Sequence, residues 1–205
     1  MADDVLSQSE IDKLLSALDE GSVSAEEVKA EEEQKKVKIY DFKRPDKFSK
    51  DQIRTLQMLH ENFGRMMNTY LSTNLRSLVD VEVASVEQLT YQEFIQSLSD
   101  PSVIGVLAVP PLKGNVIMEL NTSIAFSIID RVFGGTGSNT IKPRVLTEIE
   151  EAVIMRTFSK ALDSFREAWD NVVKFVPRLE AMESNPAFVQ IVPPSDMVVI
   201  ITLKI

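Results

Sequence analysis

Few side chains in this sequence have the types and the spacing that catalysis or metal binding requires. The chain of 205 residues contains no cysteine and one histidine, His60, which excludes thiolate sites and histidine-rich metal sites. His60 falls within a helical pattern of apolar residues, so we expect it on a helix surface or half-buried. The carboxylates lie in an acidic N-terminal segment or at helix starts, where solvation and the helix dipole account for them. We therefore expect no catalytic residue, no metal site and no cofactor.

A glycine-rich stretch, FGGTGSN, occupies residues 133–139. It lacks the Lys–Ser/Thr pair of a phosphate-binding loop and the G-x-G-x-x-G spacing of a dinucleotide site, so we do not expect it to bind a nucleotide. Gly134 or Gly135 can end a helix after Phe133, but a helix cap does not account for Gly137. Two interpretations stay open, because the stretch can be a helix C-terminus or an exposed loop whose backbone is read by a partner.

A short amphipathic helix is predicted near the N-terminus, in LSQSEIDKLL at residues 6–15. Ser7 and Glu10 have the spacing of a capping box, and Leu6 can pack against Ile11 across it. Apolar residues then recur at i, i+3, i+4 and i+7 and form one stripe, which consists of Ile11, Leu14, Leu15 and Leu18. A helix this short is marginally stable in water. We expect it to stay frayed until a partner covers the stripe, although a free terminus or docking on its own domain remains open.

The formal net charge of −9 is concentrated in the first 36 residues, which hold 11 acidic residues and 4 lysines. Residues 19–36 combine glycine, serine and glutamate with few apolar residues, a composition typical of a disordered linker. An acidic chain without a basic stripe argues against nucleic acid as a partner. The apolar runs are shorter than the roughly 20 residues of a bilayer span, and the N-terminus does not resemble a signal peptide. We expect no membrane insertion and a cytoplasmic location.

The folded part is predicted to begin near residue 37 and to alternate long helices with strands. Ser49 and Gln52 predict the start of a helix over 50–78, and Thr147 and Glu150 predict a second one from 148 to about 173. Shorter helices are expected at 91–98 and 122–133, and strands at 80–86, 102–109, 115–120, 187–193 and 197–205. The helix at 122–133 is expected to turn five apolar residues inward, namely Ile124, Ile128, Ile129, Val132 and Phe133.

This order of elements indicates an α/β fold built from two similar halves about a pseudo-twofold axis. Helices on both faces of one sheet are the natural architecture for it. The run MVVIITLKI reaches the last residue without a turn, so we expect the domain to continue beyond it.

Two of these stretches together resemble one protein family. LSQSEIDKLL resembles the N-terminal peptide of the FliM family of bacterial flagellar motor switch proteins, and YDFKRPDKFSKDQIRTLQMLHENFGR resembles the start of its middle domain. FGGTG matches the GGxG loop of that family. The likeness extends over nearly all of the chain and implies an α/β/α pseudo-twofold fold related to the CheC-type phosphatases. It also implies three regions, which are a CheY-binding peptide at 1–18, an acidic flexible linker at 19–36 and a CheC-like middle domain at 37–205.

The resemblance implies partners, a location and a function. The family belongs to the cytoplasmic C-ring of the rotor, at the inner face of the membrane, where it contacts phosphorylated CheY, the rotor protein FliG and neighbouring FliM copies. FliN binds a C-terminal domain of the family to which nothing in this sequence corresponds. Carried over by position, the CheY contact would consist of Leu6, Ser7, Glu10, Ile11, Asp12, Leu14, Leu15 and Leu18. The FliG contact would centre on Gly134, Gly135, Thr136 and Gly137. Together these contacts would control the direction of flagellar rotation in chemotaxis.

The alternative that the resemblance suggests is a phosphatase that acts on phosphorylated CheY. CheC-type phosphatases use an E-x-x-N pair on a long helix to position water at the acyl phosphate. In the second long helix Arg156 and Ser159 fall at those positions, and a guanidinium cannot accept hydrogen bonds from water as a carboxylate does. In the first long helix Glu61 and Asn62 are adjacent rather than three residues apart. We therefore expect no phosphatase activity.

Overall fold

The computed structural model describes residues 47–138 and 142–205. Contacts within the chain divide it after Pro45, and Asp46–Ile205 forms one compact unit. The predicted CheY-binding peptide and the predicted linker lie outside the described residues.

The compact unit alternates helices and strands in the order that the sequence pattern predicts, except near its end. There one predicted strand is absent and one strand that was not predicted is present. The elements are α3 (Lys50–Leu75), β1 (Glu82–Thr90), α4 (Tyr91–Ser97), β2 (Val103–Ala108), β3 (Asn115–Leu120), α5 (Thr122–Val132), α6 (Glu148–Trp169), β4 (Arg178–Glu183), η1 (Pro186–Phe188) and β5 (Met197–Lys204).

The strand predicted at 187–193 is wrong, and β4 was not predicted. Pro186 opens the single 3₁₀ turn of η1, and the residues that follow form no ladder. Val189 is nevertheless buried, and its carbonyl accepts a hydrogen bond of 2.8 Å from the Tyr91 hydroxyl. Val189 is therefore buried without pairing in a strand. β4, with the sequence RLEAME, has too much charge to be recognised as a strand from its sequence.

The first long helix begins where its capping box places it. Gln52 N–H donates to the Ser49 hydroxyl at 3.2 Å, and Ser49 N–H donates to the Gln52 side-chain oxygen at 2.8 Å. These two bonds satisfy amides that have no partner within the helix. The helix ends at Leu75, three residues before the predicted boundary, because Arg76 adopts a left-handed conformation with φ 48°.

The described strands form two sheets rather than one. In one sheet β1 pairs antiparallel with β5, and in the other β2 lies between β3 and β4 and is antiparallel to both. The first strand after each long helix thus pairs with a strand of the other half. β1 follows α3 and pairs with β5, and β4 follows α6 and pairs with β2. This reciprocal exchange is the relation that a pseudo-twofold axis requires, and it confirms the predicted fold class.

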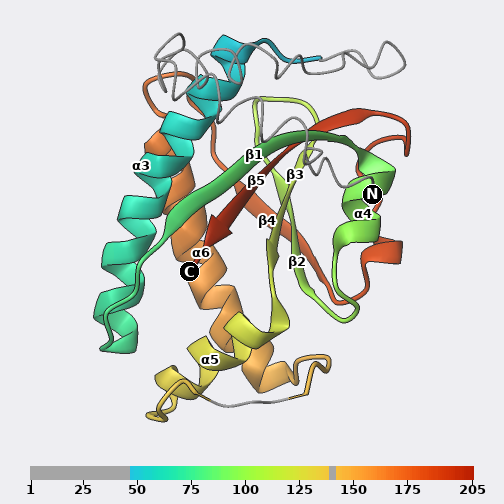
Figure 1. The fold of residues 1–205 in the computed structure, drawn as a ribbon. Coiled ribbons are helices and arrows are strands. Elements are labelled where there is room, and N and C mark those ends of the chain that lie inside the picture. The colour runs from blue at the N-terminus through green and yellow to red at the C-terminus, as the bar shows by residue number, and fades with distance from the viewer. Residues whose placement is uncertain (1–46, 139–141) are drawn as a thin grey trace, which may run out of the picture. The chain divides into compact units, whose positions relative to one another are not determined.

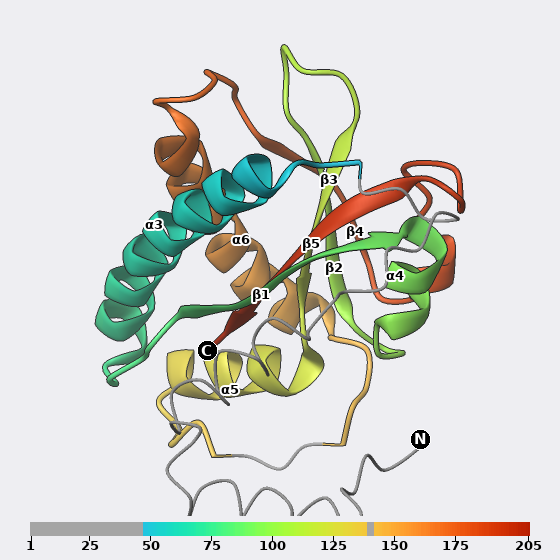
Figure 2. The same ribbon diagram turned by 45° about the horizontal axis from the view of Figure 1, so that its top comes forward.

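The two long helices pack against each other and against the strands. Figures 1 and 2 show α3 and α6 side by side on one side of the sheets, α4 on the opposite side, and α5 across the lower end. The core between them is apolar and includes Phe63, Leu71, Val103, Phe126, Ile129, Ile154, Phe158 and Phe165. Its packing holds α5 in place, and α5 leads into the glycine-rich loop.

His60 is half-buried on α3, one of the two placements predicted for it. Its half-buried ring packs against Phe63, Phe165 and Trp169, with ring centroids 5.9–6.3 Å apart. Its Nδ1 lies 2.8 Å from the Leu56 carbonyl oxygen. Burial lowers the pKa of His60 below its ordinary value, which favours the neutral ring near pH 7.

Candidate protein-binding loop

The glycine-rich loop begins as the C-terminal cap of α5. Phe133 N–H donates to the Ile129 carbonyl at 3.0 Å, Gly134 N–H to the Arg131 carbonyl at 3.0 Å, and Gly135 N–H to the Asp130 carbonyl at 2.8 Å. Gly134 has φ +93°, a left-handed conformation that favours glycine. The helix-cap interpretation is therefore correct for the first two glycines.

Gly137 also has a local structural reason, which the sequence pattern did not reveal. Its φ is +75°, and its N–H donates to the Asp130 carboxylate at 2.8 Å. The chain thus folds back on the last turn of α5 rather than leaving it. This geometry gives the loop a defined shape and leaves Gly134 and Thr136 exposed.

Two apolar side chains next to the loop face solvent, contrary to the prediction. Val132 is 47% exposed and Phe133 is 62% exposed, whereas Ile128 and Ile129 are buried as expected and Ile124 is half-buried. Helical periodicity places Val132 and Phe133 on the buried face, but no described element covers these two side chains, although Ile129 in the same last turn is buried. Sequence reasoning therefore missed two exposed apolar residues beside the predicted partner loop.

A surface hollow of about 490 Å³ lies on the other side of the loop. It is formed by the C-terminal end of α3, by α5, and by Thr136 and Gly137 of the loop. Leu78, which is 96% exposed, lines it together with the half-buried Ile124. The lining of the hollow is mixed, because it also includes the charged residues Asp80, Glu82, Arg131 and Lys204. The exposed apolar side chains nearest the loop are therefore Val132 and Phe133.

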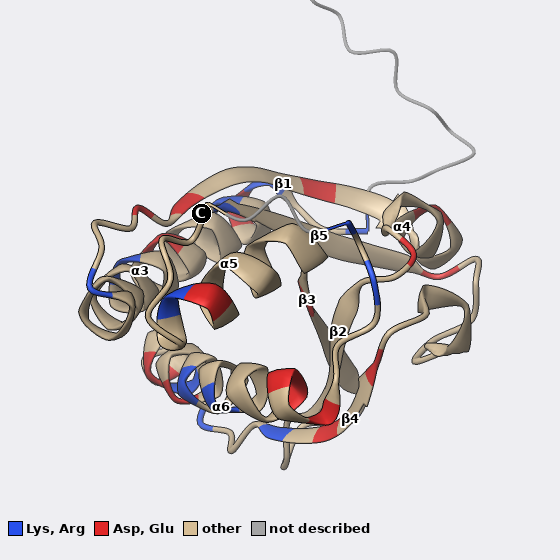
Figure 3. Cartoon of the chain, turned by 90° about the horizontal axis from the view of Figure 1, so that it is seen from below, with Lys and Arg blue, Asp and Glu red and all other residues tan. Residues whose placement is uncertain are grey.

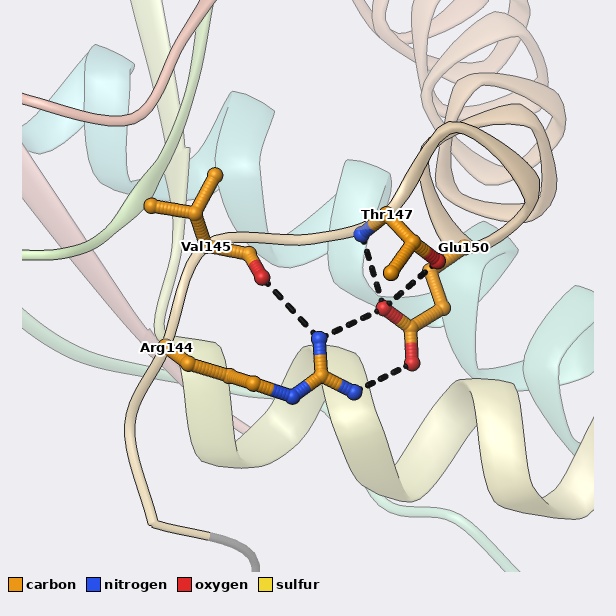
Figure 4. A network of polar contacts seen from close by, with 4 residues as sticks. All are labelled: Arg144, Val145, Thr147 and Glu150. Atoms are coloured by element: carbon orange, nitrogen blue, oxygen red, sulfur yellow. Dashed lines mark hydrogen bonds and ion pairs between the residues drawn. The ribbon is translucent and has the colours of Figure 1, made fainter.

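The residues just before α6 are held in place by the network in Figure 4. Glu150 accepts two hydrogen bonds from the Arg144 guanidinium, at 2.7 and 2.8 Å, and two from the N–H and hydroxyl of Thr147, at 2.8 and 2.9 Å. The bonds from Arg144 contribute most to lowering the pKa of Glu150 to about 2, so its carboxylate is ionised throughout the neutral range. The same guanidinium lies 4.6 Å above the ring of Phe126 in α5. It therefore ties the start of α6 to α5.

The loop carries little charge of its own. Figure 3 looks at α5 from below and shows its charge confined to one end, where Asp130 and Arg131 precede the loop. The Arg131 guanidinium donates to the Ser77 hydroxyl at 3.2 Å, beyond the end of α3. The exposed surface at the loop is thus uncharged and consists of apolar side chains, backbone and the hydroxyls of Thr136 and Ser138.

The positions that would carry phosphatase chemistry have other contacts. Ser159 is exposed on α6 and donates to the Met155 carbonyl at 2.9 Å, and Arg156 is exposed on the same helix. In α3, Glu61 accepts from Gln57 at 3.0 Å, and Asn62 accepts from Arg65 at 3.4 Å. No acid and amide spaced as E-x-x-N stand together at these positions.

The described part of the chain has neither a candidate metal site nor a candidate membrane-spanning helix. Within residues 47–138 and 142–205, no group of three or more His, Asp or Glu side chains is placed to hold a metal ion. None of the helices there combines the length and the hydropathy that crossing a bilayer requires.

The structure places the four predicted FliG-contact residues together in the loop, with Gly134 and Thr136 exposed and Gly135 and Gly137 half-buried. The predicted CheY-contact residues Leu6, Ser7, Glu10, Ile11, Asp12, Leu14, Leu15 and Leu18 all lie outside the described residues.

Comparison with known proteins decides the family. The family model described as flagellar motor switch protein FliM matches residues 49–205. The chain belongs to the FliM family. It is 51% identical over 201 residues to the FliM protein of Treponema pallidum (strain Nichols), a match that covers 98% of this chain and 58% of that protein. It is 46% identical over 204 residues to that of Bacillus subtilis (strain 168), covering 100% of this chain and 61% of the relative. The chain therefore spans about three-fifths of the length of these FliM relatives.

Solved structures agree with this FliM assignment. A structure of the FliG–FliM complex from H. pylori contains a chain with a TM-score of 0.74 and 33% identity, and the match covers 76% of this chain and 86% of that one. FliY of Thermotoga maritima has a TM-score of 0.67 at 15% identity, with 77% and 84% covered, and this likeness shows a shared fold alone.

Proposed function

We propose that this FliM-family chain is a component of the flagellar motor switch and that it binds FliG through its glycine-rich loop. The contact would consist of residues 134–137 together with Phe133, whose ring is 62% exposed. The observation that carries the proposal is an exposed loop held in one shape by hydrogen bonds and flanked by uncovered apolar side chains. Similarity to a chain solved in a FliG–FliM complex supports FliG as the partner.

We further propose that residues 1–18 bind phosphorylated CheY through the apolar stripe of the predicted N-terminal helix. The linker would hold bound CheY at a raised local concentration near the middle domain. CheY would then shift the equilibrium between the two rotational states of the ring. The size of that shift equals the difference in its binding free energy for the two states. This role places the chain among neighbouring FliM copies at the cytoplasmic face of the membrane.

The proposed role is binding and assembly rather than catalysis. Two observations support it. Ser159 and Glu61 form hydrogen bonds within their own helices, and Arg156 places a guanidinium where a CheC-type phosphatase would need a carboxylate.

The FliG contact is tested by replacing Phe133 with alanine and titrating purified FliG by calorimetry. We expect FliG affinity to fall about tenfold, because an exposed aromatic residue central to an interface contributes more than about 1 kcal/mol. Phe188→Ala is the matched control, since Phe188 is 77% exposed but belongs to η1, which packs by α4. Equal affinities for the native chain and the Phe133 variant would remove this residue from the contact, and no binding by the native chain would reject the proposed function.

A further inference from the structure

We propose that Asp130 is a positioning residue that sets the shape of the loop presented to FliG. This inference rests on the proposed FliG contact and adds a side chain that precedes the loop. It also gives Gly135 and Gly137 a different role. They let the loop fit against Asp130 and Arg131, and they need not touch the partner.

Asp130 holds the loop at two points. Its backbone carbonyl accepts from Gly135 N–H at 2.8 Å, and its carboxylate oxygen Oδ2 accepts from Gly137 N–H at 2.8 Å. The second bond is charge-assisted, which makes it stronger than a bond between neutral groups. One residue therefore fixes the backbone on both sides of Thr136, whose side chain is exposed between these two points.

The carboxylate of Asp130 explains why residue 135 is glycine. A Cβ built on Gly135 would lie 2.2 Å from Oδ2 and 2.4 Å from Cγ of Asp130, closer than nonbonded atoms approach. Gly135 has no positive φ, so the backbone itself does not require glycine there. Any side chain at 135 must push the carboxylate away, and the carboxylate then loses the Gly137 amide.

Residue 137 is restricted by the neighbouring Arg131. A Cβ on Gly137 would lie 2.8 Å from Arg131 Nε, in addition to the strain that a side chain meets at φ +75°. Arg131 is itself held by its bond to Ser77. The residues Asp130 and Arg131 thus form a brace under the loop, while Phe133, Gly134 and Thr136 form its exposed side.

The test combines Asp130→Ala, Gly135→Ala and the double variant, and it measures two quantities in each. One is the hydrogen exchange rate of the Gly137 amide in the chain alone, and the other is the affinity for FliG. We expect each single variant to speed exchange at least about tenfold and to weaken FliG binding about tenfold, since both lose the same charge-assisted bond. The double variant should be no worse than Asp130→Ala, because residues that act through one bond are not additive.

Two controls separate positioning from other effects. Asp163→Ala removes an exposed carboxylate of α6 whose ion pair with Arg166 is 3.9 Å long, and it should change neither quantity. Asp130→Asn keeps an acceptor oxygen without the charge and should retain most of the FliG affinity. If Asp130→Asn binds as weakly as Asp130→Ala while Gly137 stays protected, the carboxylate acts by direct contact and the inference is wrong.

The outcomes for the inference and for the function are distinct. Tight FliG binding by the native chain with unchanged binding and exchange in Asp130→Ala overturns the inference and leaves the function standing. Additive losses in the double variant also overturn it. No FliG binding by the native chain rejects the proposed function. The hydrogen exchange rate of the Gly137 amide alone then tests whether Asp130 shapes the loop.

Discussion

Replacing Leu14 with aspartate is expected to abolish binding of phosphorylated CheY while residues 47–205 stay folded. The four leucine and isoleucine side chains of the predicted stripe contribute roughly 6–12 kcal/mol if fully buried, at about 1.5–3 kcal/mol each. Ordering the peptide costs about 2–5 kcal/mol, and association costs at least about 4 kcal/mol. The net affinity is therefore small, and losing Leu14 to a charged group that must be desolvated removes it.

Calorimetric titration with activated CheY measures this effect. Lys13→Asp is the matched control, because it introduces the same side chain one position off the stripe and changes the net charge by more. We expect Lys13→Asp to bind CheY and Leu14→Asp to show no measurable binding. Equal binding by the native chain and Leu14→Asp would show that the stripe does not carry the contact, and equal losses in both variants would point to charge rather than burial.

Replacing Phe126 with alanine is expected to lower the free energy of unfolding by about 3–5 kcal/mol. Phe126 is 2% exposed, and its ring also supports the Arg144 guanidinium that anchors the start of α6. Because domains are stable by only about 5–15 kcal/mol, the variant would be partly unfolded or close to it.

Urea unfolding followed by circular dichroism measures the loss, with Phe133→Ala, at the C-cap of the same helix, as the control. Phe133 is 62% exposed, so its removal should change stability by less than about 0.5 kcal/mol. A loss below about 1 kcal/mol for Phe126→Ala would contradict the central position of this ring in the core.

Local signals in the sequence predicted much of the fold because they act over a few residues. The Ser49–Gln52 capping box sets the start of α3 whatever surrounds it. The same signals failed where distant partners decide the outcome. Val189 belongs to a run of strand-forming residues but packs into the core without a ladder, while the charged RLEAME run becomes β4 because β2 offers it an edge.

In the candidate site, too, some features were predicted from local signals and others depend on distant residues. The glycines marked the stretch, but their spacing left open whether it was a helix C-terminus or an exposed loop read by a partner. Their physical reason lies in side chains that precede the loop, because Asp130 occupies the space that a Cβ of Gly135 would need. Phe133 is exposed although Ile129, four residues earlier, is buried, a difference that periodicity within one helix does not indicate.

The central claim is that FliG binds at the loop after α5. Hydrogen–deuterium exchange of the chain with and without FliG tests it most directly, because every backbone amide reports separately. We expect exchange to slow across residues 131–138 and to stay unchanged across α4 and η1. Slowing at α4 and η1 with no change at 131–138 would contradict the claim.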